Sequence, residues 1–244
     1  GSQWRHDIVA LDGDTSAAAQ LPAGVECELL PTPPRLPFLA SVRAFRRLLR
    51  ERKHDVLLTY NWGAIECVAA ARTLSLRAVV HHEDGFGPSE LERRLLRRNW
   101  LRRAVLGCAR AVVVPSLRLL TIARDEWRLG PRALHLPNGV DCSRFQPAPH
   151  RTGVPVIGTV GGLRGEKDHG NLLRAAAAMQ TAAVVQLVGD GPERTRLQAL
   201  AHELGIAARV SFVGAVRDTA PCYREFDVFA LSSRTEQMPL SVLE

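Results

Sequence analysis

The sequence has few lysines, few aromatic residues and no long apolar run. Its net charge of +7 arises from 32 basic and 25 acidic residues, and only Lys53 and Lys167 are lysines. The arginine excess suits phosphate-bearing ligands, nucleic acid or an anionic membrane surface. Aromatic residues make up only 5% of the chain and no recognised nucleic-acid-binding motif occurs, so we do not expect a nucleic-acid partner. No apolar run approaches the roughly 18 residues of a membrane span.

The cysteines form no Cys-x-x-Cys pair, and no histidine lies near them at metal-ligand spacing. They are Cys27, Cys67, Cys108, Cys142 and Cys222. Such an odd, unpatterned set predicts reduced thiols in a cytoplasmic protein, and neither a disulfide framework nor a zinc site. With 46% apolar and 23% charged residues, the chain has the composition of a globular protein that can bury one large or two small cores.

Short β-rich runs alternate with longer helical patterns along the first half of the chain. The predicted strands are Asp7–Leu11, Val25–Leu29, Val56–Tyr60, Ala78–His81, Ala111–Val114 and Ala133–Leu136. The predicted helices are Phe38–Arg52, Trp62–Thr73, Ser89–Leu106 and Ser116–Trp127. This alternation predicts an α/β fold with a parallel, doubly wound sheet that places ligands at the carboxyl ends of its strands.

The turn-rich segment Pro137–Asp141 interrupts this alternation, which then restarts. Strands are predicted at Val156–Val160, Val184–Val188, Val210–Val213 and Val228–Leu231, with helices near 168–180, 192–204 and 218–225. We therefore predict a Rossmann-like domain over 1–141, a linker over 142–152 and a second Rossmann-like domain over 153–244, facing each other across a cleft. We expect both domains to be incomplete, because a first strand and helix are missing before Asp7 and the last helix has about one turn.

The last thirteen residues combine two glutamates with a predicted helix start. Pro239 suits the first position of a helix, and the free N–H groups of Met238, Leu240 and Ser241 would form an anion site there. Glu236 precedes this start and Glu244 follows it. A phosphate at the amides would have a carboxylate on each side, a spacing suited to a nucleotide sugar.

A glycine-rich turn follows the strand that begins at Val156. Its glycines let the backbone approach a phosphate, Arg164 can donate two hydrogen bonds to phosphate oxygens, and Lys167 adds a point charge. The spacing fits neither a dinucleotide fingerprint nor a P-loop. The run Gly189–Glu193 also lacks a third glycine, because Arg194 stands at that position.

Together these segments resemble the donor-site motifs of family 4 retaining glycosyltransferases of the GT-B fold. The resemblance lies in the two glutamates around Met-Pro-Leu, the turn with Arg164 and Lys167, and three shorter runs. The runs are Gly189-Asp-Gly-Pro192, Phe212-Val213-Gly214 and Pro137-Asn-Gly-Val-Asp141. The resemblance covers residues 133–244 well and 55–132 more loosely. Gly162 stands where the family usually has an arginine, whereas Lys167 matches without adjustment.

The resemblance implies transfer of a sugar from a nucleoside diphosphate sugar to a glycan or lipid-linked acceptor, with retention and without a metal or other cofactor. It implies that Glu236 holds the donor sugar, Glu244 the ribose, and Arg164 with Lys167 the diphosphate. The backbone positions that it assigns to donor binding are Gly162, Gly214, Met238, Pro239 and Leu240. Two alternative hypotheses for its function are a nucleotide-sugar epimerase of the same fold and an inactive nucleotide-binding remnant.

Polar residues follow the strand that ends at His81, in the run Val80–Pro88. In the family a histidine after this strand points into the cleft near the transferred sugar; His81 matches that place best, and His82 is the alternative. A histidine there can hydrogen-bond a sugar hydroxyl or stabilise charge at the anomeric carbon. The run Tyr60–Trp62, at the end of the preceding strand, is expected to line the acceptor side.

Two arginine-rich stretches, Arg43–Lys53 and Glu92–Arg103, carry apolar residues at helical spacing. Each predicts a basic amphipathic helix. Both stretches can be helix faces that simply contact water. The alternative is that they contact the inner face of the cytoplasmic membrane, where a lipid-linked acceptor would reach the protein.

Overall fold

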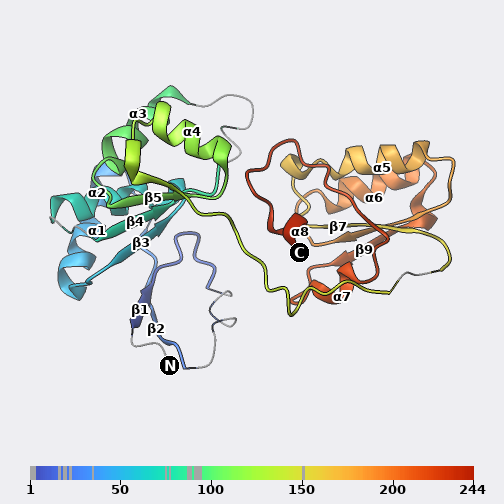
Figure 1. Ribbon diagram of the computed structural model, residues 1–244, viewed down its shortest axis with the longest axis horizontal. Helices are drawn as coiled ribbons and strands as arrows, with labels where there is room; N and C mark the ends of the chain where they lie inside the picture. The colour runs from blue at the N-terminus through green and yellow to red at the C-terminus, as the bar shows by residue number, and fades with distance from the viewer. Residues whose placement is uncertain are drawn as a thin grey trace. The chain divides into compact units, whose positions relative to one another are not determined.

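The computed structural model describes residues 4–15, 18, 21, 24–34, 36–74, 76, 78–86, 90, 95–149 and 152–244. The chain forms two compact units, each with parallel strands and packed helices (Figure 1). The described residues up to Leu136, apart from Glu90, belong to the first unit, and Glu90 and the described residues from Pro137 on belong to the second. The α/β fold class predicted from the alternating pattern is therefore confirmed.

The main sheet of the first unit has four parallel strands in the order β3-β4-β5-β6. They are β3 (Leu57–Tyr60), β4 (Val79–His82), β5 (Ala111–Val114) and β6 (Ala133–His135). The connecting helices are α1 (Phe38–Arg52), α2 (Ile65–Thr73), α3 (Leu96–Leu106) and α4 (Leu117–Asp125), with short turns η2 (Trp62–Ala64) and η4 (Gly130–Arg132). The helix predicted over Ser89–Leu106 is wrong at Leu95, whose extended backbone makes Leu96 the first residue of α3; residues 89 and 91–94 of that prediction lie outside the described part.

Alternation along the strands separates the two faces of this sheet. Thr59, His81 and Val112 are neighbours on adjacent strands and are all buried. Successive side chains of a strand point to opposite faces, so this face packs against the helices while Leu58 and Tyr60 lie on the other. Leu58 is 51% exposed and Tyr60 54% exposed. One face of the sheet thus carries the core, and the other is largely open among the described residues.

The first two strands do not join this sheet. β1 (Arg5–Ile8) and β2 (Glu26–Leu29) pair with each other in parallel, and within the described residues they form a separate two-stranded sheet. The single doubly wound sheet expected for the first unit is thus divided in this structure. Two strands are too few for independent stability in water, so other contacts must hold them.

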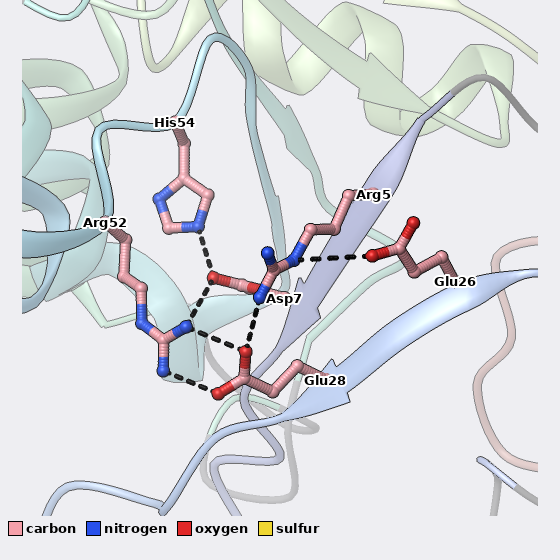
Figure 2. Close-up of polar contacts among 6 residues, drawn as sticks. All are labelled: Arg5, Asp7, Glu26, Glu28, Arg52 and His54. Carbon is pink, nitrogen blue, oxygen red and sulfur yellow. Dashed lines mark hydrogen bonds and ion pairs between the residues drawn. The ribbon is translucent and has the colours of Figure 1, made fainter.

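A cluster of charged side chains connects these two strands to α1 (Figure 2). Arg52, at the end of α1, donates two hydrogen bonds to Glu28, at 2.7 and 2.8 Å, and Arg5 donates a third at 2.8 Å. Asp7, on β1, lies 2.9 Å from Nε2 of His54. The cluster therefore joins both strands to the residues at and just after the C-terminal end of α1.

The second unit contains one sheet of four parallel strands in the order β10-β7-β8-β9. They are β7 (Val156–Val160), β8 (Val184–Val188), β9 (Val210–Gly214) and β10 (Val228–Phe229). The helices are α5 (His169–Ala178), α6 (Arg194–Glu203), α7 (Ala220–Tyr223) and α8 (Leu240–Leu243), with turns η5 (Gly165–Lys167) and η6 (Ala207–Arg209). Ile157, Val185 and Leu187 pack with α5 and α6 into a second core, separate from that of the first unit.

The opposite face of this sheet is closed by Phe226 at Gly158. A Cβ atom on Gly158 would lie only 2.2 Å from the Phe226 ring, so the ring occupies the place of a side chain. Strand β7 can therefore be buried on both faces although its middle residue has no side chain.

Candidate functional site

The strand order of the second unit has a switch point between β7 and β10. From β7 the chain moves to β8 on one side, and β10 lies on the other side of β7. In open parallel sheets, ligands bind outside the carboxyl ends of the strands at such a point. Two predicted site segments leave the sheet here, because residues 161–168 follow β7 and residues 230–239 follow β10.

The glycine-rich turn after β7 packs directly against the turn after β8. Gly161 N donates to Val188 O and Leu163 N to Asp190 O, both at 2.9 Å. A Cβ on Gly191 would lie 2.5 Å from the Leu163 carbonyl oxygen, and one on Gly189 would lie 2.0 Å from the Gly161 oxygen. The Gly-Asp-Gly sequence is thus explained by two main chains in close contact.

Lys167 and Glu236 meet at the switch point. Lys167 Nζ lies 2.5 Å from Glu236 Oε1, with the two side chains 26% and 22% exposed. Ser232 Oγ donates to Lys167 O at 2.8 Å, and Arg234 N donates to Glu166 O at 3.0 Å. The segment after β10 is therefore fastened along η5, and the two charged residues predicted for donor binding are in contact.

Arg164 and Gly162 lie together on the same turn. Arg164 is exposed, and its side chain folds back so that a Cβ on Gly162 would lie 3.3 Å from Arg164 Nε. The guanidinium is thus positioned beside the position where family members usually carry an arginine. Gly214, at the end of β9, also borders this region, because its carbonyl accepts a hydrogen bond of 2.8 Å from Gly189 N.

The Met-Pro-Leu segment is held by Asn138, from the Pro-Asn-Gly-Val-Asp run. Asn138 Nδ2 donates to Met238 O at 2.9 Å. Helix α8 begins at Leu240, so the prediction that Pro239 is the first helical residue is wrong by one position, and Pro239 caps the helix instead. Pro239 has extended backbone angles, as a residue just before a helix does.

Glu244 lies in a different environment from Glu236. Its Oε2 accepts a hydrogen bond of 3.4 Å from Thr219 Oγ1, and it lines a cavity of about 580 Å³ with Tyr223 and Phe226. Burial, followed by the Glu244 carboxylate, raises the pKa of Tyr223 well above its usual value. The structure thus brings Glu236 to Lys167 and places Glu244 against α7.

His169, at the start of α5, has no counterpart among the predicted site residues. Its side chain is only 4% exposed and lies near the Gly162 backbone. Burial lowers the pKa of His169, which favours a neutral ring beneath the glycine-rich turn. Its position directly after the Lys-Asp pair of this turn could have marked His169 as a site residue. Its burial could not have been predicted, because a polar residue at the start of a helix is usually exposed.

In the first unit, His81 is enclosed in the protein interior. Its ring has no exposed surface; Nδ1 lies 2.9 Å from Thr59 Oγ1, and Nε2 lies 3.4 Å from Glu83 Oε2. Glu83 in turn accepts from the guanidinium of Arg102, on α3, at 3.4 Å. A ligand in solvent therefore cannot touch His81 in this structure.

Three aromatic rings surround the buried guanidinium of Arg102. Its central carbon lies 4.9, 5.2 and 5.1 Å from the ring centroids of Trp62, Phe86 and Trp127. Favourable cation–π contacts of this kind are strongest when the cation is desolvated, as Arg102 is. The cluster connects the segments after β3 and β4 to α3 and to the end of α4.

His82 lies on the opposite, open face of the sheet. It stacks on Tyr60 with a centroid distance of 4.8 Å, and burial lowers its pKa. Next to it, Asn61 Oδ1 accepts from Asp84 N at 2.8 Å, and Asn61 itself has a positive φ of 59°. Such backbone strain in a non-glycine residue often accompanies functional sites. Solvent thus reaches Tyr60 and Asn61, from the run predicted to line the acceptor side, and His82, the alternative histidine for the reacting centre.

The parallel sheets and the strand-end turns are those of a GT-B glycosyltransferase, and solved structures support this. Sucrose-phosphate synthase from Thermosynechococcus elongatus aligns with a TM-score of 0.76 and 19% identity, covering 98% of this chain and 77% of that one. Anabaena HepE in complex with UDP aligns with a TM-score of 0.65 and 19% identity, over 86% of this chain and 61% of that one.

Family models identify the chain more closely. The model described as "Glycosyltransferase Family 4" matches residues 2–144, and the model described as "Glycosyl transferases group 1" matches residues 154–244. The chain therefore belongs to glycosyltransferase family 4.

Two curated relatives of the chain are bacterial glycosyltransferases. A GDP-mannose-dependent alpha-(1-6)-phosphatidylinositol monomannoside mannosyltransferase of Mycolicibacterium smegmatis is 30% identical over 87% of this chain and 59% of the relative. A UDP-Gal:alpha-D-GlcNAc-diphosphoundecaprenol alpha-1,3-galactosyltransferase of Escherichia coli is 25% identical over 84% of this chain and 59% of the relative. The chain thus spans about three fifths of the length of these relatives.

Proposed function

We propose that the chain transfers a sugar from a nucleoside diphosphate sugar to a glycan or lipid-linked acceptor, with retention of configuration. The contact between Lys167 and Glu236 at the switch point is the observation that carries this proposal. In this proposal Lys167 would be the cation for the diphosphate, and the neighbouring Glu236 would be the carboxylate for the sugar hydroxyls. The names of the two relatives above, which include nucleotide-sugar donors and lipid-linked acceptors, support the same class of substrates.

We further propose that an incoming diphosphate takes over Lys167 and thereby frees Glu236 for the donor sugar. Arg164 is exposed beside the turn and would bind the same diphosphate. Backbone groups at Gly162, Gly214 and the Met238–Leu240 segment would line the donor, and Glu244 would reach the ribose. Two basic side chains offset the charge of the leaving diphosphate, so this proposal needs no metal ion.

For the reacting centre, the burial of His81 favours different roles for the two histidines, with His82 in contact with substrate and His81 in a structural role. His82 reaches the open face and would meet the sugar, whereas His81 would hold the end of β4 in place through Thr59 and Glu83. This proposal uses the alternative that the sequence left open.

Replacing Lys167 by Ala tests the donor site. We expect calorimetry to show that wild-type chain binds UDP, GDP or ADP, and that Lys167→Ala weakens this binding about tenfold to 100-fold, because a charge-assisted contact is lost. Arg174→Ala removes an equal charge from the exposed side of α5 and serves as the control. Near-normal binding by Lys167→Ala would show that the assignment is wrong, and a wild-type chain that binds none of the three nucleotides would favour an inactive remnant.

The reaction itself is tested by incubating the chain with nucleotide sugars and analysing the products by NMR. Transfer predicts a product whose anomeric configuration matches that of the donor. An epimerase would instead convert the nucleotide sugar without an acceptor.

A further inference from the structure

Helix α3 presents large apolar side chains to solvent. Leu96 and Trp100 are each 74% exposed and lie one turn apart. At about 100° per residue, Arg103 falls on the same stripe and Arg97 beside it. Both arginines are exposed. A tryptophan so exposed on a helix is unusual for a surface that faces only water.

The buried side of α3 explains why these residues cannot turn inward. Arg102, Val105 and Leu106 are buried, with Arg102 fixed among three aromatic rings and bonded to Glu83. Rotation of the helix to hide Trp100 would expose this buried guanidinium and its carboxylate partner. The outward position of Leu96 and Trp100 is therefore set by the core.

The other arginine-rich helix, α1, presents a different surface. Leu39, in its first turn, is 67% exposed. The exposed residues past that turn are Arg43, Arg46, Arg47, Arg50, Glu51 and Arg52, so this face is mainly basic and carries no aromatic side chain. Such a face attracts anions but offers a single leucine to an apolar phase, whereas α3 offers a leucine and a tryptophan one turn apart. The two helices that look alike in sequence are thus distinguished by what they expose.

We propose that the stripe of Leu96, Trp100 and Arg103, with Arg97 beside it, inserts shallowly into the surface of a bilayer that contains anionic lipid. Trp suits the boundary between headgroups and acyl chains, and arginine pairs with lipid phosphates while its stem stays apolar. The net charge of +7 has the sign that such a surface attracts. This inference names the residues that would contact the membrane. It rests on the proposed function only for the reason to be there, which is to reach a lipid-linked acceptor.

Vesicle co-sedimentation tests the contact without donor or acceptor, so its failure would leave the proposed transfer reaction untouched. We expect binding to vesicles with equal amounts of phosphatidylglycerol and phosphatidylcholine, and little binding to phosphatidylcholine alone. Trp100→Ala should weaken binding about tenfold without a change in charge. Trp4→Ala, which removes another exposed tryptophan outside α3, should have no effect.

Charge-reversal variants distinguish vesicle binding through α3 from attraction by the net charge of the whole chain. Arg97→Glu with Arg103→Glu should weaken vesicle binding at least about 25-fold, from about fivefold per arginine. Arg43→Glu with Arg46→Glu changes the net charge equally but lies on α1, and should have a much smaller effect. Thermal melting checks that each variant is folded. Equal losses from the two double variants, unchanged binding by Trp100→Ala, or equal binding to both kinds of vesicle would each overturn the proposal.

Discussion

At the scale of single residues, the glycines at the ends of β7 and β8 determine how the floor of the candidate donor site is built. The backbone of Leu163 lies against Gly191 and that of Gly161 against Gly189. Such contact leaves no volume for a side chain. The sequence therefore needs glycine here for packing, whereas a glycine in an open turn is needed only if its φ is positive.

Replacing Gly191 by Ala should destabilise the second unit by about 1–3 kcal/mol, because the new methyl group would press on the Leu163 carbonyl. Urea unfolding measures the change. Gly165→Ala is the matched control, since a Cβ there meets no atom within 4 Å. Equal stabilities of the two variants would contradict the close backbone contact.

The two adjacent histidines show how far the sequence can be interpreted at this scale. Period-two alternation places His81 and His82 on opposite faces of β4. It does not say which face the helices cover, and that depends on contacts with Thr59, Glu83 and Arg102 from other elements. Arg102 itself looked like one of several arginines on a basic helix face, and nothing in its immediate sequence predicts a guanidinium enclosed by aromatic rings.

At the scale of elements, the β1–β2 pair depends on charged contacts with α1. Arg52 first, and then Arg5, lower the pKa of Glu28 from its usual 4.5 to about 2. A carboxyl group with a lowered pKa in the folded state stabilises the fold at pH above its unfolded value. That contribution is lost as pH falls from about 4.5 to about 2.

Glu28→Gln should therefore lower the melting temperature at neutral pH, and its difference from wild type should vanish near pH 2. Circular dichroism melts over this pH range measure both quantities. Added salt should also shrink the difference, because the ion pairs are exposed to solvent. Glu203→Gln, on the exposed side of α6, is the control. A difference that stays constant with pH would argue against the cluster.

Most elements of the sheets were predictable because their patterns are local. Val156–Val160 and Val184–Val188 are short apolar runs between turns, and both are strands with the predicted bounds. The separate pairing of β1 and β2 was not predictable, since strand partners are chosen by contacts between distant segments. For the same reason the sequence did not predict the present partners of the two glutamates, which are Lys167 for Glu236 and Thr219 for Glu244.

At the scale of the whole chain, each unit has a core of its own. Leu119 and Trp127 belong to the first core, and Leu173 and Leu187 to the second. Two separate cores of this kind favour two unfolding events.

Among the described residues, no helix is long and apolar enough to cross a bilayer.

Calorimetry should therefore resolve two transitions. Leu119→Ala should destabilise the first unit and Leu173→Ala the second, each by about 2–5 kcal/mol, because both side chains are fully buried. Each variant should shift one transition and leave the other in place. A single transition that moves in both variants would show that the two cores unfold as one.

The pairing of Lys167 with Glu236 also has a consequence for turnover. If a diphosphate binds Lys167 as proposed, its departure would not leave an unpaired charge at the carboxyl ends of the strands, because Glu236 would pair with the ammonium group again. In the proposed reaction, Glu236 would then act as an internal competitor that displaces the product nucleotide from the ammonium group. The same contact that lowers affinity for an arriving donor would shorten the residence time of the product.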